Sequence, residues 1–151
     1  MATKSRKAAT KSSSVATLTT TRLKKLAVEV IIPRDEESKN GKLNFSYQIS
    51  LLPPGNNDPL IVVGLQINGI GVSTDEKLFD KTAFTFDAVF EGLFALSSKP
   101  KANEWVGREV YLANYLVPIL ADMIETLLSK CGYSGILIPR SIPNQPAANA
   151  P

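Results

Sequence analysis

Apolar and polar side chains alternate most regularly between residues 43 and 52. Leu43, Phe45 and every second residue to Leu51 are apolar, and the residues between them are Asn, Ser, Gln and Ser. A period of two with one polar face predicts a half-buried antiparallel strand. The segment PPGNNDP then ends this strand, because two prolines and a glycine cannot continue a ladder of hydrogen bonds.

Three more runs predict strands, over residues 25–32, 60–73 and 82–97. The run 60–73 starts apolar on both faces and then contains several glycines, which predict a bulge or a bend. The run 82–97 places four of the six Phe residues on one face, with Asp87 and Glu91 on the other. We therefore expect one face of this strand to be the more deeply buried face.

The apolar spacing changes from two to helical after Pro100. It is interrupted at Pro118, so that either one helix kinks there or a new helix begins. Residues 119–130 predict a strongly amphipathic helix with Gly132 as its C-terminal cap, and residues 133–143 predict an extended arm. Four strands followed by helices predict an α+β fold, a four-stranded antiparallel sheet with helices packed on one face.

The charge is divided unevenly between the start of the chain and the rest. The whole chain carries +3, but residues 1–25 contain seven Lys and Arg and no acid, so the remaining body is acidic. The first 22 residues are rich in Ser, Thr, Ala and Lys and predict a disordered basic leader. We expect a folded domain over 23–142 and a disordered tail over 143–151. The leader also resembles an organelle transit peptide, and its alternative role is a solubilising tail.

The residue inventory excludes several chemistries. The chain has no His and one Cys, so a Ser-His-Asp triad, a Cys-His pair, a His-ligated metal and an internal disulfide are all impossible. We interpret Cys131 as a small packing residue. We expect no enzyme activity, no cofactor and no metal, and a cytoplasmic protein without a membrane span, because no run of 18 apolar residues exists.

Two stretches resemble the SecB family of export chaperones. The first contains Leu116-Val117-Pro118 at the opening of a helix, Ser129-Lys130 and Gly132 at its end, and the apolar run Ile136-Leu137-Ile138-Pro139 after it. The second, TAFTFDAVFEGLFAL over residues 82–96, is similar to the last strand of that family. The resemblance extends over about residues 25–142.

The resemblance implies a dimer of dimers that binds non-native polypeptides in apolar grooves without ATP. Its clients would belong to protein export or to a toxin–antitoxin system. It also implies SecA as a partner, through acidic surface on the sheet and a C-terminal helix. No such helix follows Pro143 here, which counts against that partnership.

Two sets of side chains are candidates for these roles, and each has ordinary core or surface packing as its alternative. Loosely specific binding needs adaptable apolar side chains. The groove candidates are Phe84, Phe86, Phe90, Phe94, Trp105, Tyr111, Tyr115, Leu120, Met123, Ile124 and Leu127. The acidic partner-binding candidates are Asp75, Glu76, Asp80, Asp87 and Glu91.

A second hypothesis belongs to another functional class. The basic leader would tether a nucleic-acid-associated or virion-type structural protein, and binding would then weaken steeply with salt. Only the leader suggests nucleic acid, because the body of the chain is acidic.

Overall fold

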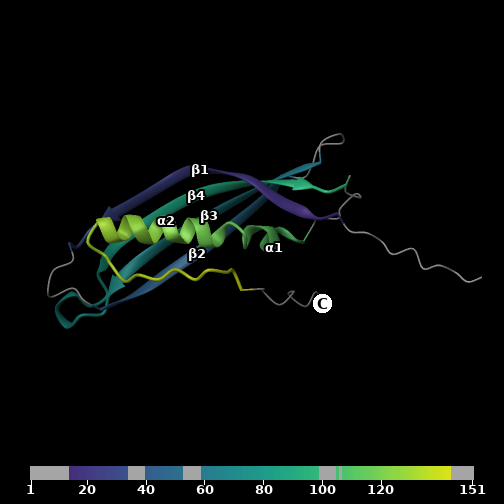
Figure 1. The fold of residues 1–151 in the computed structure, drawn as a ribbon. Helices are drawn as coiled ribbons and strands as arrows, with labels where there is room; N and C mark the ends of the chain where they lie inside the picture. Colours follow the sequence, from purple (N-terminus) through teal and green to yellow (C-terminus); the bar gives the residue numbers. More distant parts are fainter. Residues whose placement is uncertain (1–13, 34–39, 53–58, 99–104, 106, 144–151) are drawn as a thin grey trace, which may run out of the picture.

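The structure is a computed structural model, and it describes residues 14–33, 40–52, 59–98, 105 and 107–143. Four long strands form one antiparallel sheet, and two helices lie in a row on one of its faces (Figure 1). This is the predicted α+β architecture. The strands are β1 (Ala16–Val30), β2 (Gly41–Leu52), β3 (Leu60–Ser73) and β4 (Thr82–Leu96), and the helices are α1 (Glu109–Ala113) and α2 (Val117–Lys130).

The sheet has the order β1-β4-β3-β2. Strands β2, β3 and β4 follow one another as hairpins, with a short 3-10 turn (η1, Glu76–Leu78) between the last two. Strand β1 crosses over to pair with β4 along its whole length. The two edges of the sheet are therefore β1 and β2.

The start of β1 corrects the predicted leader. Residues 1–22 were expected to be disordered and the domain to begin at 23, but β1 begins at Ala16. Threonine is β-branched and favours strands, and the TLTTT segment pairs with the far end of β4, where Thr19 Oγ1 donates to the carbonyl of Leu93 at 3.0 Å. Pairing partners this distant in sequence are invisible to local composition. Residues 1–13 lie outside the described residues.

The proline at 118 starts a new helix. Pro118 lies in the first turn of α2, where its missing N–H has no intrahelical partner to lose. The other end of α2 is capped as expected: Gly132 has a φ of 95°, and the N–H of Tyr133 donates to Leu128 O at 2.8 Å. The chain then continues as an extended arm, residues 133–143, which runs back along α2 (Figure 1).

The core lies between the sheet and the helices. Alternate residues of β3 and β4 are buried there, including Phe90 and Phe94, as the parity of the Phe residues predicted. A register shift between Gly71 and Val72 confirms the bulge expected from the glycines of β3. At Gly92 the absent side chain leaves room for Leu116, at the start of α2, since a Cβ there would lie 2.5 Å from Leu116 Cδ2.

Replacing Gly92 by Ala should separate α2 from β4. The new methyl group would meet the fully buried Leu116, so we expect a loss of about 1–3 kcal/mol in the free energy of unfolding. Gly64→Ala is the matched control, because its methyl group would meet only the mobile hydroxyl of Ser50. Chemical denaturation measures both variants. Equal stability of the two would contradict the proposed contact.

Candidate functional site

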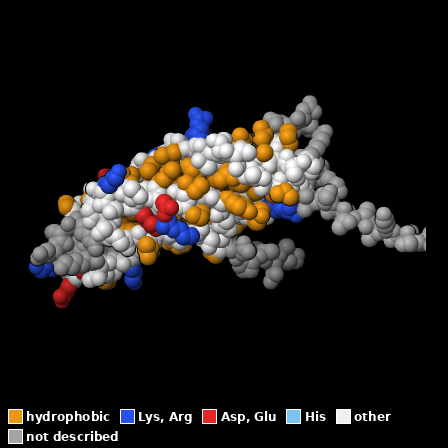
Figure 2. All heavy atoms as spheres, in the orientation of Figure 1, with side chains coloured by type: hydrophobic (Ala, Val, Ile, Leu, Met, Phe, Trp, Pro, Cys, Tyr) orange, Lys and Arg blue, Asp and Glu red, His pale blue; other side chains and the backbone are white. Residues whose placement is uncertain are grey.

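An apolar stripe runs along the row of helices, and its α2 end lies beside β1. It consists of five residues spaced by four, one in α1, one in the turn between the helices and three in α2: Tyr111, Tyr115, Ile119, Met123 and Leu127. Tyr111 and Tyr115 are about half exposed. Their rings pack edge to face, with 5.6 Å between the ring centroids. Figure 2 shows the resulting band of hydrophobic side chains along the helices and β1. Exposed apolar bands of this kind mark interaction surfaces.

Part of this stripe forms one wall of a groove of about 430 Å³ between β1 and α2. Leu23 and Leu26 of β1 form one wall, and Met123 and Leu127 of α2 form the other. Polar groups stand around it, on Asp122, Thr126 and Lys130. An apolar interior with a polar rim is suited to holding apolar side chains.

A bulge in β1 creates the groove wall. The register of β1 against β4 shifts between Leu23 and Lys25. As a result Leu23 opposes Phe90 and Leu26 opposes Ala88, so both leucines face the helices although they are three residues apart. Sequence reasoning missed both residues. Their spacing of three inside a strand was the available signal for a bulge.

The structure divides the eleven groove candidates into two groups. Four reach the surface and belong to the stripe: Tyr111, Tyr115, Met123 and Leu127. The other seven are core residues with at most 5% exposure: Phe84, Phe86, Phe90, Phe94, Trp105, Leu120 and Ile124. These seven lie beneath the surface, and of them Phe84 also lines the cavity between the arm and the sheet.

The acidic candidates fall in two separate places. Asp75, Glu76 and Asp80 lie in the connection between β3 and β4, whereas Asp87 and Glu91 lie on the open face of β4. The second pair faces the lysines of β1: Lys25 Nζ is 2.6 Å from Asp87 Oδ2, and Lys24 Nζ is 3.6 Å from Glu91 Oε1. Hydrogen bonds from Lys25 and from Gln66 hold the pKa of Asp87 below its ordinary value. These two carboxylates therefore add little net charge to the sheet face.

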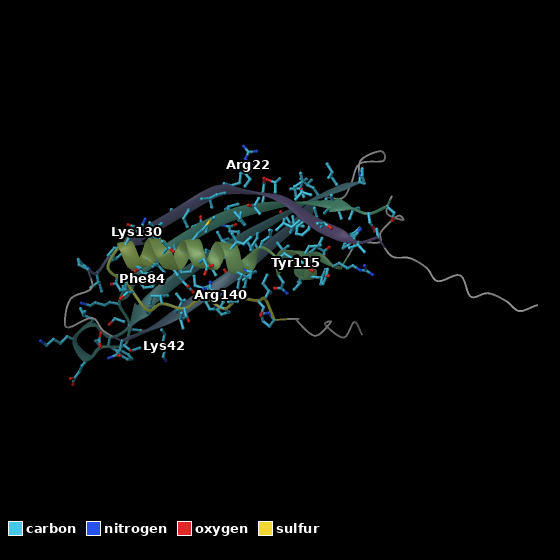
Figure 3. All side chains as sticks on the ribbon, in the orientation of Figure 1. Arg22, Lys42, Phe84, Tyr115, Lys130 and Arg140 are labelled. Carbon is cyan, nitrogen blue, oxygen red and sulfur yellow. The ribbon has the colours of Figure 1, made fainter. Side chains whose placement is uncertain are left out.

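The arm is fastened to α2 mainly through Glu125. The Glu125 carboxylate accepts the N–H of Ile138 at 2.7 Å and Arg140 Nη2 at 2.8 Å, and Arg140 also contacts Asp122. Figure 3 shows Arg140 on the arm, beside α2. Further along, the N–H of Ile142 donates to Asn114 Oδ1 at 2.7 Å. The arm thus covers part of the sheet without pairing with it in the sheet ladder.

A second cavity, of about 310 Å³, lies between the arm and the sheet. Leu43, Phe84, Tyr133 and Ile136 provide its apolar lining. Leu137 stands at this cavity with 79% of its surface exposed. The helical layer is therefore bordered on both sides by a recess, the apolar groove at β1 and this cavity of mixed polarity at β2.

Within the described ranges, no cluster of three or more Cys, Asp or Glu side chains is arranged to hold a metal ion. The helices in those ranges also include none that is long and apolar enough to cross a membrane.

Comparison with known proteins identifies the fold. No protein-family model matches the sequence, and no curated protein matches it. Among solved structures, the chain is similar to a SecB-like chaperone from Mycobacterium tuberculosis in complex with an antitoxin peptide. The TM-score is 0.69 at 12% identity, covering 82% of this chain and 89% of that one. The chain thus has the SecB-like fold that its sequence predicted.

A second solved structure, a protein of unknown function from Streptococcus agalactiae, matches more loosely. Its TM-score is 0.49 at 13% identity, covering 85% of this chain and 99% of that one.

Removing the Glu125 carboxylate should release the arm. In Glu125→Ala the N–H of Ile138 loses its acceptor, so its hydrogen exchange should accelerate roughly tenfold or more, as expected for a bond to a charged group. Asp122→Ala is the control, because this carboxylate is largely exposed and contacts Arg140, whereas the N–H of Ile138 bonds to Glu125. An Ile138 amide equally slow in both variants would contradict the role of Glu125.

The Asp87 contact should appear in the pH dependence of stability. Because the folded-state pKa of Asp87 is lowered, its contribution is complete above about pH 4 and is lost as the pH falls through that pKa. In Lys25→Met the pKa of Asp87, measured by NMR titration, should rise toward the ordinary value of an aspartate, because the largest cause of its lowering is removed. Lys24→Met should leave it unchanged, since Lys24 pairs with Glu91. The same pKa in all three proteins would refute the pairing.

Proposed function

We propose that this protein is an ATP-independent chaperone that holds non-native polypeptides in the groove between β1 and α2. The observation that carries the proposal is the exposed apolar stripe beside that groove, on a fold shared with a SecB-like chaperone. The protein is then a binding protein of the cytoplasm, and its function includes no chemical step and needs no cofactor.

The groove suits a client that offers apolar side chains without a fixed sequence. Met123 is flexible and polarisable and therefore adapts to side chains of different shape. Tyr111 and Tyr115 extend the same surface with rings that carry a polar hydroxyl at the tip. Burying one client side chain of the size of Leu or Phe contributes about 1.5–3 kcal/mol, so a few such contacts give useful but reversible affinity.

The neighbour in structure supports one class of client. That chaperone was solved with a peptide from an antitoxin, which supports an antitoxin or a similarly unfolded segment as the client here. Clients on a protein export route fit the same groove, since both present extended apolar segments.

We further propose that the chaperone works as a homo-oligomer, a dimer of dimers. The support is that β1 is an edge strand over 15 residues and that the described helices cover one face of the sheet. Edge strands and uncovered sheet faces are typical sites of association between copies. A mass in solution of four chains is the expected result.

SecA is the less supported partner. The acidic candidates do not form one surface, and those on the sheet are paired with lysines. The nucleic-acid tether stays a prediction, because Lys4, Arg6, Lys7 and Lys11 lie outside the described residues. A test of that alternative must delete residues 1–13 alone, since a deletion through 22 would remove nearly half of β1.

Polar residues in the groove should weaken chaperone activity. We expect Leu23→Gln combined with Met123→Gln to weaken binding of an unfolded client at least tenfold, because two apolar contacts are lost. The control is Phe79→Gln, which replaces a side chain that is 68% exposed outside the groove. Light scattering of an aggregating client, without ATP, measures activity. A wild-type protein that fails to slow aggregation would overturn the proposed function.

A further inference from the structure

The dipeptide Asn-Gly occurs twice in the chain, at residues 40–41 and at residues 68–69. Asparagine is a thermolabile residue, because the backbone nitrogen of the next residue can attack its side-chain carbonyl carbon. A glycine in the next position has no side chain to hinder this attack, and its backbone bends readily. Whether either asparagine reacts therefore depends on how firmly the backbone around the glycine nitrogen is held.

The hydrogen bonds at the start of β2 show where each glycine N–H points. The N–H of Thr74 donates to Asn40 O at 3.0 Å, one step beyond the pair Gly41–Ser73. In an antiparallel ladder, bonded and non-bonded pairs alternate, and the register of β2 with β3 is unbroken. Even-numbered residues of β2 and β3 therefore bond to one another, and odd-numbered residues turn their N–H groups to the other side of their strand.

The two glycines differ in what lies on that other side. Gly69 belongs to β3, which has β4 beyond it, and Gly69 pairs there with Phe86. Its N–H is thus held inside the sheet. Gly41 belongs to the edge strand β2, so its N–H points away from the four strands that the structure describes. The backbone at Asn40 is held to β3 by the last bond of the ladder, whereas the backbone at Asn68 is held from both sides.

Asp75 contacts Asn40 through two further hydrogen bonds. The Asp75 carboxylate accepts the backbone N–H of Asn40 at 3.1 Å and its side-chain Nδ2 at 3.2 Å. The N–H of Asp75 donates to Ser73 Oγ at 3.2 Å, which helps to position the carboxylate. These bonds fasten the start of β2 to the connection between β3 and β4, at one end of the sheet (Figure 1). Asn40 is the donor in both of its bonds to Asp75.

We propose that Asn40 is a site of spontaneous deamidation and that the reaction breaks the contact with Asp75. The Gly41 nitrogen forms a bond to Asn40 Cγ, which closes a succinimide ring. The bond from Cγ to the side-chain nitrogen breaks, and that nitrogen leaves as ammonia with the proton that the Gly41 nitrogen has lost. Water then opens the ring at either of its carbonyl carbons, which leaves aspartate or isoaspartate at position 40. Water is the co-reactant, and no atom is oxidised or reduced.

Either product has a carboxylate where the amide donated a hydrogen bond. An ionised carboxylate only accepts hydrogen bonds, and two carboxylates at this distance repel each other. The contact with Asp75 therefore changes from attraction to repulsion and does not form again. Asn40 and Gly41 also line the 310 Å³ cavity between the arm and the sheet, so the new charge lies at the wall of that cavity. The modification goes beyond the proposed chaperone function and does not depend on it.

NMR spectra of the isotopically labelled, full-length protein, recorded while it ages at mildly alkaline pH, test the proposal. The side-chain amide signals of Asn40 should disappear at least about tenfold faster than those of Asn68, because Asn68 reacts only when the interior of the sheet opens. The N–H of Thr74, which donates to Asn40 O, should exchange with solvent at least about tenfold faster in aged protein than in fresh protein.

Three variants separate the reaction from its consequence. Asn40→Gln keeps a side-chain amide but would have to close a larger and less favoured ring, so ageing should leave the exchange of Thr74 unchanged. Asn40→Asp carries the charge of the product from the start, so its Thr74 amide should exchange rapidly without ageing. Adding Asp75→Asn to Asn40→Asp removes the repulsion and supplies a donor, and it should restore slow exchange.

Three results would overturn the proposal. Equal rates of loss at Asn40 and Asn68 would show that the edge position does not control the reaction, and the site would be rejected. Loss of the Asn40 amide without faster exchange at Thr74 would reject the break in the contact. Fast exchange that Asp75→Asn fails to slow would reject repulsion between the two carboxylates as its cause. Binding of an unfolded client is not a readout here, so these results leave the proposed chaperone function to its own test.

Discussion

The whole arrangement depends on covering a wide apolar sheet face with a narrow row of helices. Four strands about 4.8 Å apart, with side chains, span more than the roughly 10 Å width of one helix. The helix α2 has 14 residues, about 21 Å, whereas β4 has 15 residues and extends about 50 Å. The helices therefore lie over the middle of the sheet, where the missing side chain of Gly92 leaves room for Leu116. Both margins of the sheet are left with apolar residues that are only partly covered.

The two margins, at β1 and at β2, are where the protein has partly exposed apolar surface. At β1 the uncovered residues form the groove with α2, and the bulge at Leu23 widens its apolar wall. At β2 the arm provides partial cover, held by Glu125. A sheet with a second helical layer or a wider first one would bury both margins. The SecB-like fold shared at 12% identity is consistent with this, because it demands periodicity and a few close contacts instead of particular residues.

The sequence predicted the fold well and the site partly. Strand 43–52 follows from local alternation, strand 60–73 follows from its apolar run, and the start of α2 follows from Pro118. The beginning of β1 did not, because its Thr-rich segment is ordered by β4, a partner far along the chain. For the groove, the apolar spacing identified residues of the stripe, but it did not show which candidate side chains are exposed. Phe90 and Met123 look alike in a pattern, yet one is 1% exposed and the other lines the groove, since burial depends on how the layers stack.

The crossover of β1 has a consequence for the synthesis of the protein on the ribosome. Thr19 and the carbonyl it bonds are 74 residues apart, and the whole of β2 and β3 separates them. A ribosome that adds about 5–20 residues per second therefore exposes β1 for several seconds before β4 exists to pair with it. During that time the apolar side chains of β1 lack the residues that they pack against in the folded protein. A protein proposed to bind non-native polypeptides thus exposes apolar side chains of its own while it is being synthesised.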